Sequence, residues 1–299
     1  MSRPVALVTG GGRGIGAAIS DRLASDGYDV LLTYNSSSKP AEMIVDAIRE
    51  RGDDALAVKV DCADSGEVGL LAHHPWMERG IDVLVLNHGI YNRVQGHAMT
   101  LEDLSATMKT NFEGAVAVWK AVQPNLTSHA RMVVVGSQLG TRGSPHGADY
   151  SASKAALATW ARSLAQSVGP EGKRVNILAP GYVDTDLLSG DSDEKRQQRR
   201  NEVPLQRVGT PEDMAATVSF LVGPDSAYIT GAILHVNGGL ISPEQGSVMV
   251  TAWWTSGMMK ARLNRWPTSR CWKWICRNAT PLICPKPSKA PLWMRSIPR

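Results

Sequence analysis

Residues 4–16 read PVALVTGGGRGIG, an apolar run that passes directly into a cluster of glycines. The apolar run favours a buried strand, and residues 15–25 then place apolar side chains at helical spacing. The glycines therefore fall between a strand and the start of a helix, where free backbone N–H groups can face a phosphate. Gly10, Gly14 and Gly16 allow a tight turn and a close approach of the backbone to a pyrophosphate. A glycine-rich turn without a ligand is the alternative.

The same alternation of apolar strands and helices continues along the chain. Further strands are predicted at residues 29–33, 55–60, 82–86, 131–136, 174–178 and 232–236, and helices at 41–51, 101–122, 150–168 and 211–222. The strand at 82–86, DVLVL, shows almost no polar alternation, which is typical of a parallel strand covered on both faces. We therefore predict an α/β fold with a single Rossmann-type, doubly wound parallel sheet, flanked by helices on both faces in three layers.

Composition limits the class of protein. The 299 residues are 43% hydrophobic and 20% charged, which supplies a core and argues against global disorder. The sequence has no apolar run of transmembrane length, no signal-peptide pattern at its start and no CxxC pair among its four cysteines. We therefore expect a cytoplasmic protein without a membrane span, a disulfide framework or a metal site.

The charge divides the chain near residue 242. Residues 1–242 carry 22 Lys and Arg against 27 Asp and Glu, whereas residues 243–299 carry 10 against one. We expect a folded domain at 1–242 and a basic extension at 243–299. Basic residues interleaved with Trp can bind a membrane surface, a nucleic acid or a partner protein. The abrupt change in composition, recurrent Pro and the lack of a sustained period favour out-of-frame or otherwise unselected sequence, which would be irregular and dispensable for catalysis. Three cysteines in this extension lack zinc-finger spacing: Cys271, Cys276 and Cys284.

A second group of residues points to proton transfer at an oxygen atom. Ser137 follows a predicted strand, and Tyr150 and Lys154 lie four residues apart on a predicted helix, so both project from one face. An adjacent ammonium lowers the pKa of a tyrosine from about 10 by favouring the phenolate. With a serine hydroxyl to hold a carbonyl or alcohol, such a pair can move a proton while a hydride moves at the attached carbon. A Tyr and a Lys at this spacing also occur on ordinary solvated helices.

Taken together, these motifs resemble the short-chain dehydrogenase/reductase family over residues 4–242. The resemblance implies that residues 1–242 form an NAD(P)-binding catalytic domain. The resemblance implies that Ser137, Tyr150 and Lys154 are catalytic and that Asn111 holds the water of a proton relay. Asp61 would face the adenine ring. The implied cofactor-binding residues are Gly10, Arg13, Gly14, Ile15, Gly16, Asn35, Ser36, Asp61, Cys62, Asn87, Gly89, Tyr150, Lys154, Pro180, Gly181, Val183 and Thr185.

The end of the second predicted strand bears on the choice of cofactor. Residues 33–38, TYNSSS, contain no acid, whereas NAD-dependent enzymes usually place Asp or Glu there to bind the ribose hydroxyls. Arg13, within the glycine loop, can donate to a 2′-phosphate or can be an ordinary surface arginine. By resemblance we expect NADP(H) to be preferred over NAD(H).

For two histidines and one basic segment, the sequence leaves two possible roles open. His88 stands where the family usually has Ala, and is either a catalytic group or a tolerated neighbour of the cofactor. His146 either lines the substrate mouth or lies on a surface loop. Residues 186–207 lie where the family carries its substrate lid. The basic residues of this segment either dock an acidic carrier or form the solvated face of a mobile helix. These residues are Lys195, Arg196, Arg199 and Arg200.

The stretches YSASKAAL and RVNILAPGYVDTD are similar to 3-oxoacyl-[acyl-carrier-protein] reductases. The resemblance implies an NADPH-dependent reductase of a carbonyl, with a 3-oxoacyl thioester on an acyl carrier protein or CoA as substrate. The alternatives are an NADP-dependent dehydrogenase of a small ketone, sugar, steroid or polyol, and a non-catalytic NADP-binding regulatory protein. By resemblance we expect a homotetramer or homodimer. We expect no nucleic-acid partner and, the extension apart, no membrane partner.

Overall fold

The apolar run before the glycines forms β1 (Val5–Thr9), and all five of its residues are buried. The structure, a computed structural model, describes residues 3–240. The extension expected at 243–299 lies outside the described residues, so the expectations for it stay predictions. β1 is an interior strand of a parallel sheet with the order β3-β2-β1-β4-β5-β6-β7. The other strands are β2 (Asp29–Tyr34), β3 (Ala55–Lys59), β4 (Ile81–Leu86), β5 (Leu126–Val135), β6 (Arg174–Pro180) and β7 (Ile233–Val236).

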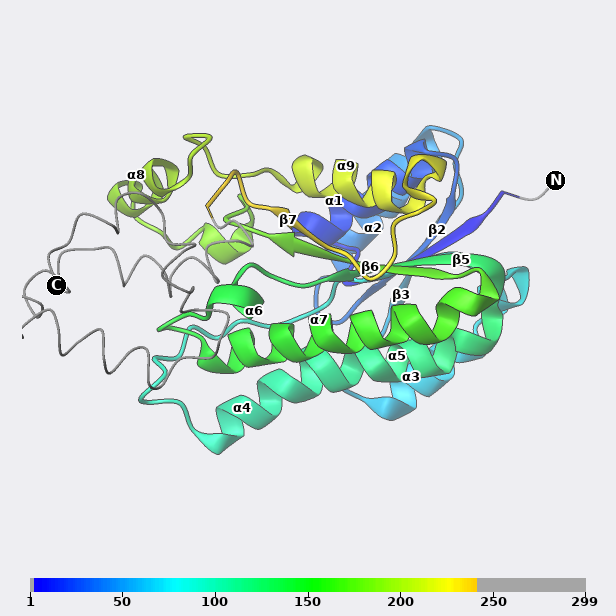
Figure 1. Cartoon of the computed structure of the whole chain (residues 1–299). Helices are drawn as coiled ribbons and strands as arrows, with labels where there is room; N and C mark the ends of the chain where they lie inside the picture. Colours follow the sequence, from blue (N-terminus) through cyan, green and yellow to red (C-terminus); the bar gives the residue numbers. More distant parts are fainter. Residues whose placement is uncertain (1–2, 241–299) are drawn as a thin grey trace, which may run out of the picture. The chain divides into compact units, whose positions relative to one another are not determined.

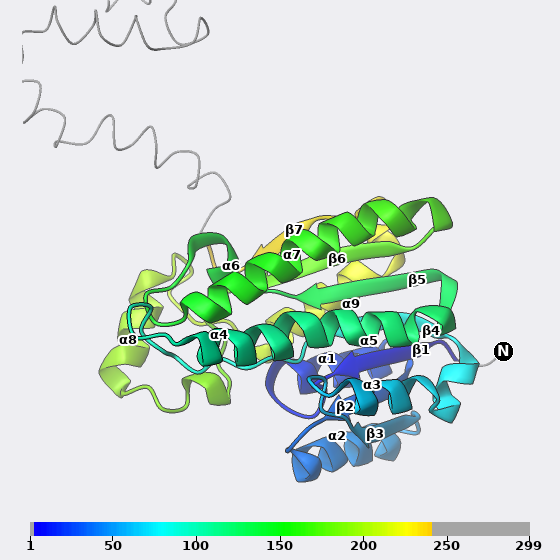
Figure 2. The same cartoon turned by 90° about the horizontal axis from the view of Figure 1, so that it is seen from below.

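Helices cover both faces of this sheet (Figures 1 and 2). They are α1 (Gly14–Ser25), α2 (Ser38–Glu50), α3 (Ser65–Ala72), α4 (Leu101–Met108), α5 (Gly114–Val122), α6 (Leu139–Arg142), α7 (Ala148–Val168), α8 (Asp193–Glu202) and α9 (Pro211–Val222). Because side chains alternate along a strand, Val5 and Leu7 join the core under α3, α5 and α7, whereas Ala6 and Val8 join the core under α1, α2 and α9. The predicted three-layer fold is confirmed.

Several helical features differ from the sequence prediction, among them the following two. The single helix expected at 101–122 is interrupted by a π-helical turn, Lys109–Glu113, between α4 and α5. Such turns are frequent at functional sites. The helix α3 was not predicted because it is only eight residues long; Asp64 caps it by accepting hydrogen bonds from the backbone N–H groups of Gly66 and Glu67.

The strand order determines where a ligand can bind. From β1 the chain builds outward through β2 to β3, then returns to place β4 on the other side of β1. This reversal leaves a crevice beyond the carboxyl ends of β1 and β4, the usual ligand position in doubly wound sheets. Within residues 3–240, no helix is both long enough and apolar enough to cross a membrane.

Candidate active site

A cavity of about 1030 Å³ is lined by the segments that follow β1 to β6. Every cofactor-binding residue predicted from the sequence lines it, as do the predicted catalytic residues Ser137, Tyr150 and Lys154. Asn111 does not line it and is fully buried. A Cβ atom built on Gly89, which does line the cavity, would lie 3.1 Å from Asn111 Oδ1, so Asn111 lies directly behind the cavity wall.

The glycine loop forms a cradle that side chains would fill. Gly10 has a φ of +62°, in the left-handed region that favours glycine. A Cβ atom on Gly16 would lie 2.1 Å from the carbonyl oxygen of Gly10. The first turn of α1 therefore packs directly on the loop, and its free backbone N–H groups can hold a pyrophosphate. These residues fit the dinucleotide that the motif implies.

The ends of β1 and β4 are joined by a group of hydrogen bonds. Asn87 Nδ2 donates to the carbonyl oxygens of Thr9 at 3.1 Å and Gly10 at 3.0 Å. His88 Nδ1 lies 2.7 Å from the Thr9 hydroxyl, which donates to the Val85 carbonyl. Burial lowers the pKa of His88 to about 4, an effect that the nearby Lys154 ammonium reinforces. His88 is therefore neutral near pH 7, and its ring is hydrogen-bonded to Thr9, at the end of β1 beside the cavity.

Tyr150 and Lys154 lie on the first turns of α7 and face the cavity near Ser137, which follows β5. Lys154 Nζ donates to the carbonyl oxygen of Val135 at 2.8 Å and lies 5.7 Å from the centre of the Tyr150 ring. Burial lowers the pKa of Lys154 to about 8. Burial also raises the pKa of Tyr150 to about 12, against the opposing effect of a hydrogen bond with Ser137.

The net shift in the pKa of Tyr150 is upward, opposite to the sequence prediction, which expected a lowered value. The charged phenolate is disfavoured because the half-buried ring has lost part of its contact with water. Tyr150 is consequently a neutral phenol near pH 7, able to donate its proton.

Asn111 lies in the π-helical turn and braces three segments. Its Oδ1 accepts from the N–H of Ile90 at 2.7 Å, and its Nδ2 donates to the Ile90 carbonyl and to the Ser153 hydroxyl, both at 3.0 Å. The Ser153 hydroxyl in turn donates to the carbonyl of Tyr150 at 2.8 Å. Both polar atoms of the Asn111 side chain are therefore engaged in hydrogen bonds within the protein. The role of Asn111 in a proton relay stays a prediction.

Sequence reasoning missed several residues that line the cavity. We call the part of the cavity around Tyr150 the substrate end, because the predicted catalytic residues Ser137, Tyr150 and Lys154 lie there. The Tyr91 ring lies with its centre 4.6 Å from that of Tyr150. A Cβ atom on Gly147 would lie 2.4 Å from Tyr91 Cε2, so a side chain there would displace the ring. Nearness to the Asn87–Gly89 motif was the available signal for Tyr91. The other missed lining residues include Arg93, Gln138, Arg142, Leu188, Gln198 and Glu202.

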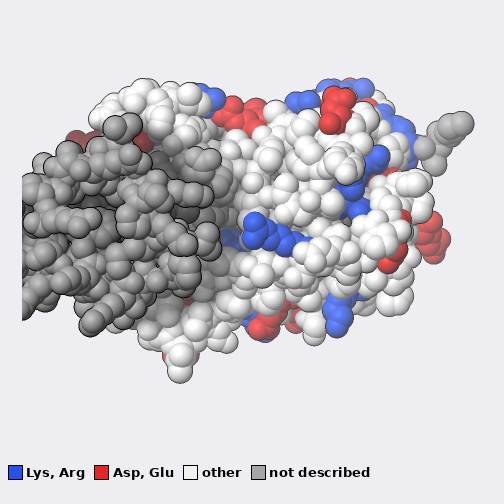
Figure 3. All heavy atoms as spheres, viewed as in Figure 1, with Lys and Arg blue, Asp and Glu red and all other residues white. Residues whose placement is uncertain are grey.

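The basic residues of α8 divide between two faces. Lys195 and Arg199, four residues apart, line the cavity, whereas Arg196 and Arg200 are not among its lining residues. His146 lines the cavity as well. On the face shown in Figure 3, the described Lys and Arg residues are interspersed with Asp and Glu.

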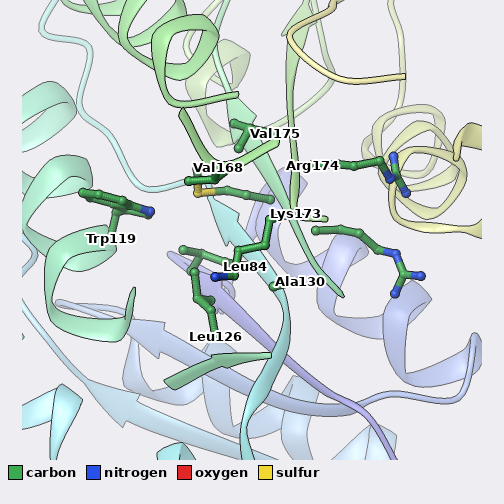
Figure 4. Close-up of a pocket in the computed structure, with 10 residues that line it drawn as sticks. Leu84, Trp119, Leu126, Ala130, Val168, Lys173, Arg174 and Val175 are labelled. Atoms are coloured by element: carbon green, nitrogen blue, oxygen red, sulfur yellow. The ribbon is translucent and has the colours of Figure 1, made fainter. Parts of the chain in front are cut away.

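A second cavity, of about 20 Å³, has room for about one water molecule and is lined mainly by apolar residues (Figure 4). Leu126 and Arg174 line it, and these residues begin β5 and β6, at the other end of the sheet. Among residues 3–240, no group of three His, Cys, Asp or Glu side chains could hold a metal ion. The larger cavity is therefore the candidate active site.

Known proteins are similar to this chain. A family model described as enoyl-(acyl carrier protein) reductase matches residues 10–241. The 3-oxoacyl-[acyl-carrier-protein] reductase FabG of Vibrio cholerae is 39% identical over 238 residues, which cover 79% of this chain and 96% of the relative. The enzyme of the same name from Staphylococcus aureus is 35% identical, with 79% and 97% covered.

Solved structures lead to the same family. A short-chain dehydrogenase from Burkholderia cenocepacia J2315 in complex with NADP has a TM-score of 0.75 and 39% identity, covering 79% of this chain and 97% of its own. A blue fluorescent protein from a metagenomic library, in complex with NADPH, has a TM-score of 0.75 and 37% identity, covering 80% and 98%. Identity at this level over nearly the whole length of the relatives goes beyond a shared fold. The chain belongs to the short-chain dehydrogenase/reductase family and is an NAD(P)-dependent oxidoreductase.

Proposed function

We propose that the protein is an NADPH-dependent reductase that transfers a hydride to the carbonyl carbon of a 3-oxoacyl thioester. The observation that carries this proposal is the position of a neutral Tyr150 phenol beside Ser137, in the same cavity as the glycine loop. NADPH, when bound, supplies the hydride. The protein must then hold the carbonyl, donate a proton to its oxygen and stabilise the charge that develops.

The residues at the adenosine end of the cavity support a preference for NADPH. Residues 33–37 line the cavity without a carboxylate. The Arg13 side chain is 62% exposed and pairs loosely with Asp186, at 3.8 Å, so its guanidinium is available to a 2′-phosphate. Two similar structures hold NADP or NADPH. We assign Arg13, Asn35 and Ser36 to the 2′-phosphate.

Proton transfer follows from the surroundings of Tyr150. Ser137 donates a hydrogen bond to the substrate oxygen, and the Tyr150 phenol donates its proton to that oxygen as charge develops there. The Lys154 ammonium, with its pKa near 8, is mostly charged at pH 7. In this buried site its charge stabilises the phenolate that Tyr150 becomes. The same groups serve the reverse reaction, in which Tyr150 accepts the proton.

The 3-oxoacyl thioester is favoured by two relatives whose names state this activity. The competing substrates are a small ketone, sugar, steroid or polyol. An enoyl thioester is a further competitor, because the family model carries that description. We also propose a homo-oligomer. Support comes from the half-buried Trp119 of α5 and Trp160 of α7, whose rings pack edge to face at 6.0 Å on the helix layer that covers one face of the sheet.

The test is oxidation of NADPH and of NADH at 340 nm with acetoacetyl-CoA, with crotonyl-CoA and with a panel of small ketones and sugars. We expect turnover with acetoacetyl-CoA, faster with NADPH than with NADH. Turnover of crotonyl-CoA alone would replace carbonyl reduction with reduction of a carbon–carbon double bond. Turnover of the panel alone would place the protein among the small-substrate dehydrogenases. Tight NADPH binding without any turnover would favour a regulatory protein.

A further inference from the structure

A buried carboxylate lies near the substrate end of the cavity, outside the groups that the proposed reaction uses. The side chain of Asp191, which precedes α8, is only 1% exposed. A buried carboxylate is tolerated only when it is paired. Asp191 Oδ2 accepts from Arg199 Nε at 2.6 Å, and Oδ1 accepts from Arg93 Nη1 at 3.2 Å. Lys195 Nζ lies 3.8 Å from Oδ1.

These contacts keep Asp191 ionised. Burial by itself raises the pKa of Asp191, but hydrogen bonds from Arg199 and Arg93 outweigh that effect and hold the pKa below its ordinary value. We call Asp191, Arg93 and Arg199 the Asp191 clasp.

The Asp191 clasp joins two segments that are far apart in the sequence. Arg93 belongs to the loop after β4, and Arg199 belongs to α8; both line the cavity. Arg93 adopts a φ of +53°, a left-handed conformation that is uncommon for a residue other than glycine. Residues held in such conformations persist where the surrounding contacts fix them, and the bond to Asp191 is one of those contacts.

The Asp191 clasp is connected to the proposed proton donor on one side and to the Pro180–Gly181 segment on the other. The Arg93 guanidinium lies 5.9 Å from the centre of the Tyr91 ring, and that ring packs on Tyr150 at 4.6 Å. On the other side, the Arg199 guanidinium lies 4.5 Å over the ring of Tyr182. The contacts therefore run in the order Tyr150, Tyr91, Arg93, Asp191, Arg199 and Tyr182.

The attachment of α8 depends on its two ends. No residue of α8 is buried, so the side chains of the helix itself do not hold it against the domain by apolar packing. Val203, just after α8, is 2% exposed and packs closely on Gly238. At the other end the buried group is Asp191. The ion pairs of Asp191 therefore attach the first end of α8 to the domain, and the apolar packing of Val203 attaches the other end.

We propose that Asp191 is a positioning residue, which fastens α8 to the loop after β4 and thereby sets Tyr91 against Tyr150 at the substrate end of the cavity. Asp191 acts through Arg93 and Arg199. Loss of its charge releases α8 and lets the Tyr91 ring move, which weakens substrate binding more than it slows the chemical step. The effect on substrate rests on the proposed function, whereas the fastening of α8 does not.

Trypsin offers a direct test, because α8 carries four cleavage sites: Lys195, Arg196, Arg199 and Arg200. The full chain is digested as wild type, as Asp191→Asn and as Asp193→Asn. The last is the matched control: Asp193 is 96% exposed and pairs only with Arg196, at 3.8 Å, among the described residues. Cleavage sites are identified by mass spectrometry, and the melting temperature of each variant is measured.

We expect Asp191→Asn to be cut within residues 195–200 about tenfold faster than wild type, with the control unchanged and cuts elsewhere unaffected. Equal cleavage rates in all three proteins overturn the fastening role. If Asp191→Asn does not fold, Arg93→Gln replaces it, since that change leaves Asp191 paired with Arg199.

The second readout is kinetic. We expect KM for the thioester to rise about tenfold in Asp191→Asn with kcat changed less than threefold, and Asp191→Glu to restore part of the loss. Faster cleavage with unchanged KM and kcat would overturn the positioning role. If wild type does not turn over the thioester, the proposed function fails while the proteolysis result still decides whether Asp191 fastens α8.

Discussion

The Lys154 ammonium lies 5.7 Å from the centre of the Tyr150 ring and donates its hydrogen bond to the carbonyl of Val135, at the end of β5. Lys154 therefore places a cation near the Tyr150 ring while its hydrogen bond goes to the backbone of β5. The pKa of Tyr150 is raised to about 12 and that of Lys154 is lowered to about 8, both because of burial. At pH 7 this arrangement combines a protonated phenol with a mostly protonated amine.

The pKa of Lys154 predicts how stability without cofactor changes with pH. Lysine ordinarily has a pKa near 10.4, so the unfolded chain holds this proton more tightly than the folded protein, whose value is about 8. Below pH 8 both states are protonated. Between about pH 8 and 10.4 the folded protein has released the proton and the unfolded chain has not, so the contribution of Lys154 to stability rises with pH.

Comparison with Lys154→Met isolates this contribution. The melting temperature of the wild type relative to that of the variant should increase from pH 7 to pH 9.5, measured by thermal unfolding. The other titratable groups are common to both proteins. A constant difference between the two melting temperatures would show that the Lys154 pKa is not lowered.

Arg13 should control the choice between the two cofactors. Arg13→Gln removes a charge-assisted hydrogen bond to the 2′-phosphate, an interaction worth about 1.5–3 kcal/mol, so the Kd of NADPH should rise roughly 10- to 100-fold. The Kd of NADH should stay unchanged, because NADH lacks that phosphate. Fluorescence titration measures both.

The matched control for Arg13 is Arg22→Gln. Arg22 lies on α1, the helix that follows the glycine loop, and pairs with Asp26 at 2.9 Å. Equal weakening of NADPH and NADH by Arg13→Gln would place the guanidinium away from the 2′-phosphate.

The glycine cradle predicts a severe effect of one added methyl group. In Gly16→Ala the new Cβ atom would lie 2.1 Å from the Gly10 carbonyl and 2.5 Å from Asn87 Nδ2, so the backbone of the loop must move. NADPH binding should be lost in isothermal titration.

Gly69→Ala in α3 is the control for this change, because nothing lies within 4 Å of its added Cβ atom. It should stabilise the protein by about 0.5–1 kcal/mol, as alanine favours a helix over glycine. Unaltered NADPH affinity in Gly16→Ala would show that the glycine loop is not part of the cofactor site.

The sequence predicted the sheet well because its strands contain continuous apolar runs buried on both faces, such as Val83–Leu86 in β4. The predicted cofactor residues lie at the ends of those strands, so a correct prediction of the strands also brought these residues together in one cavity. The contacts at the substrate end depend on tertiary packing. Arg93 and Asp191, for example, are 98 residues apart and no local pattern pairs them. The raised pKa of Tyr150 likewise depends on how deeply the ring is buried, which spacing alone does not show.

The most direct test of the central claim is the single-turnover rate of NADPH oxidation with acetoacetyl-CoA, in wild type and Tyr150→Phe, at saturating cofactor. General acid catalysis contributes on the order of 10²- to 10⁴-fold, so we expect the rate to fall by about a thousandfold. NADPH affinity should remain within about twofold, because the substitution leaves the ring in place. Equal rates in the two proteins would contradict the role of Tyr150 as the proton donor.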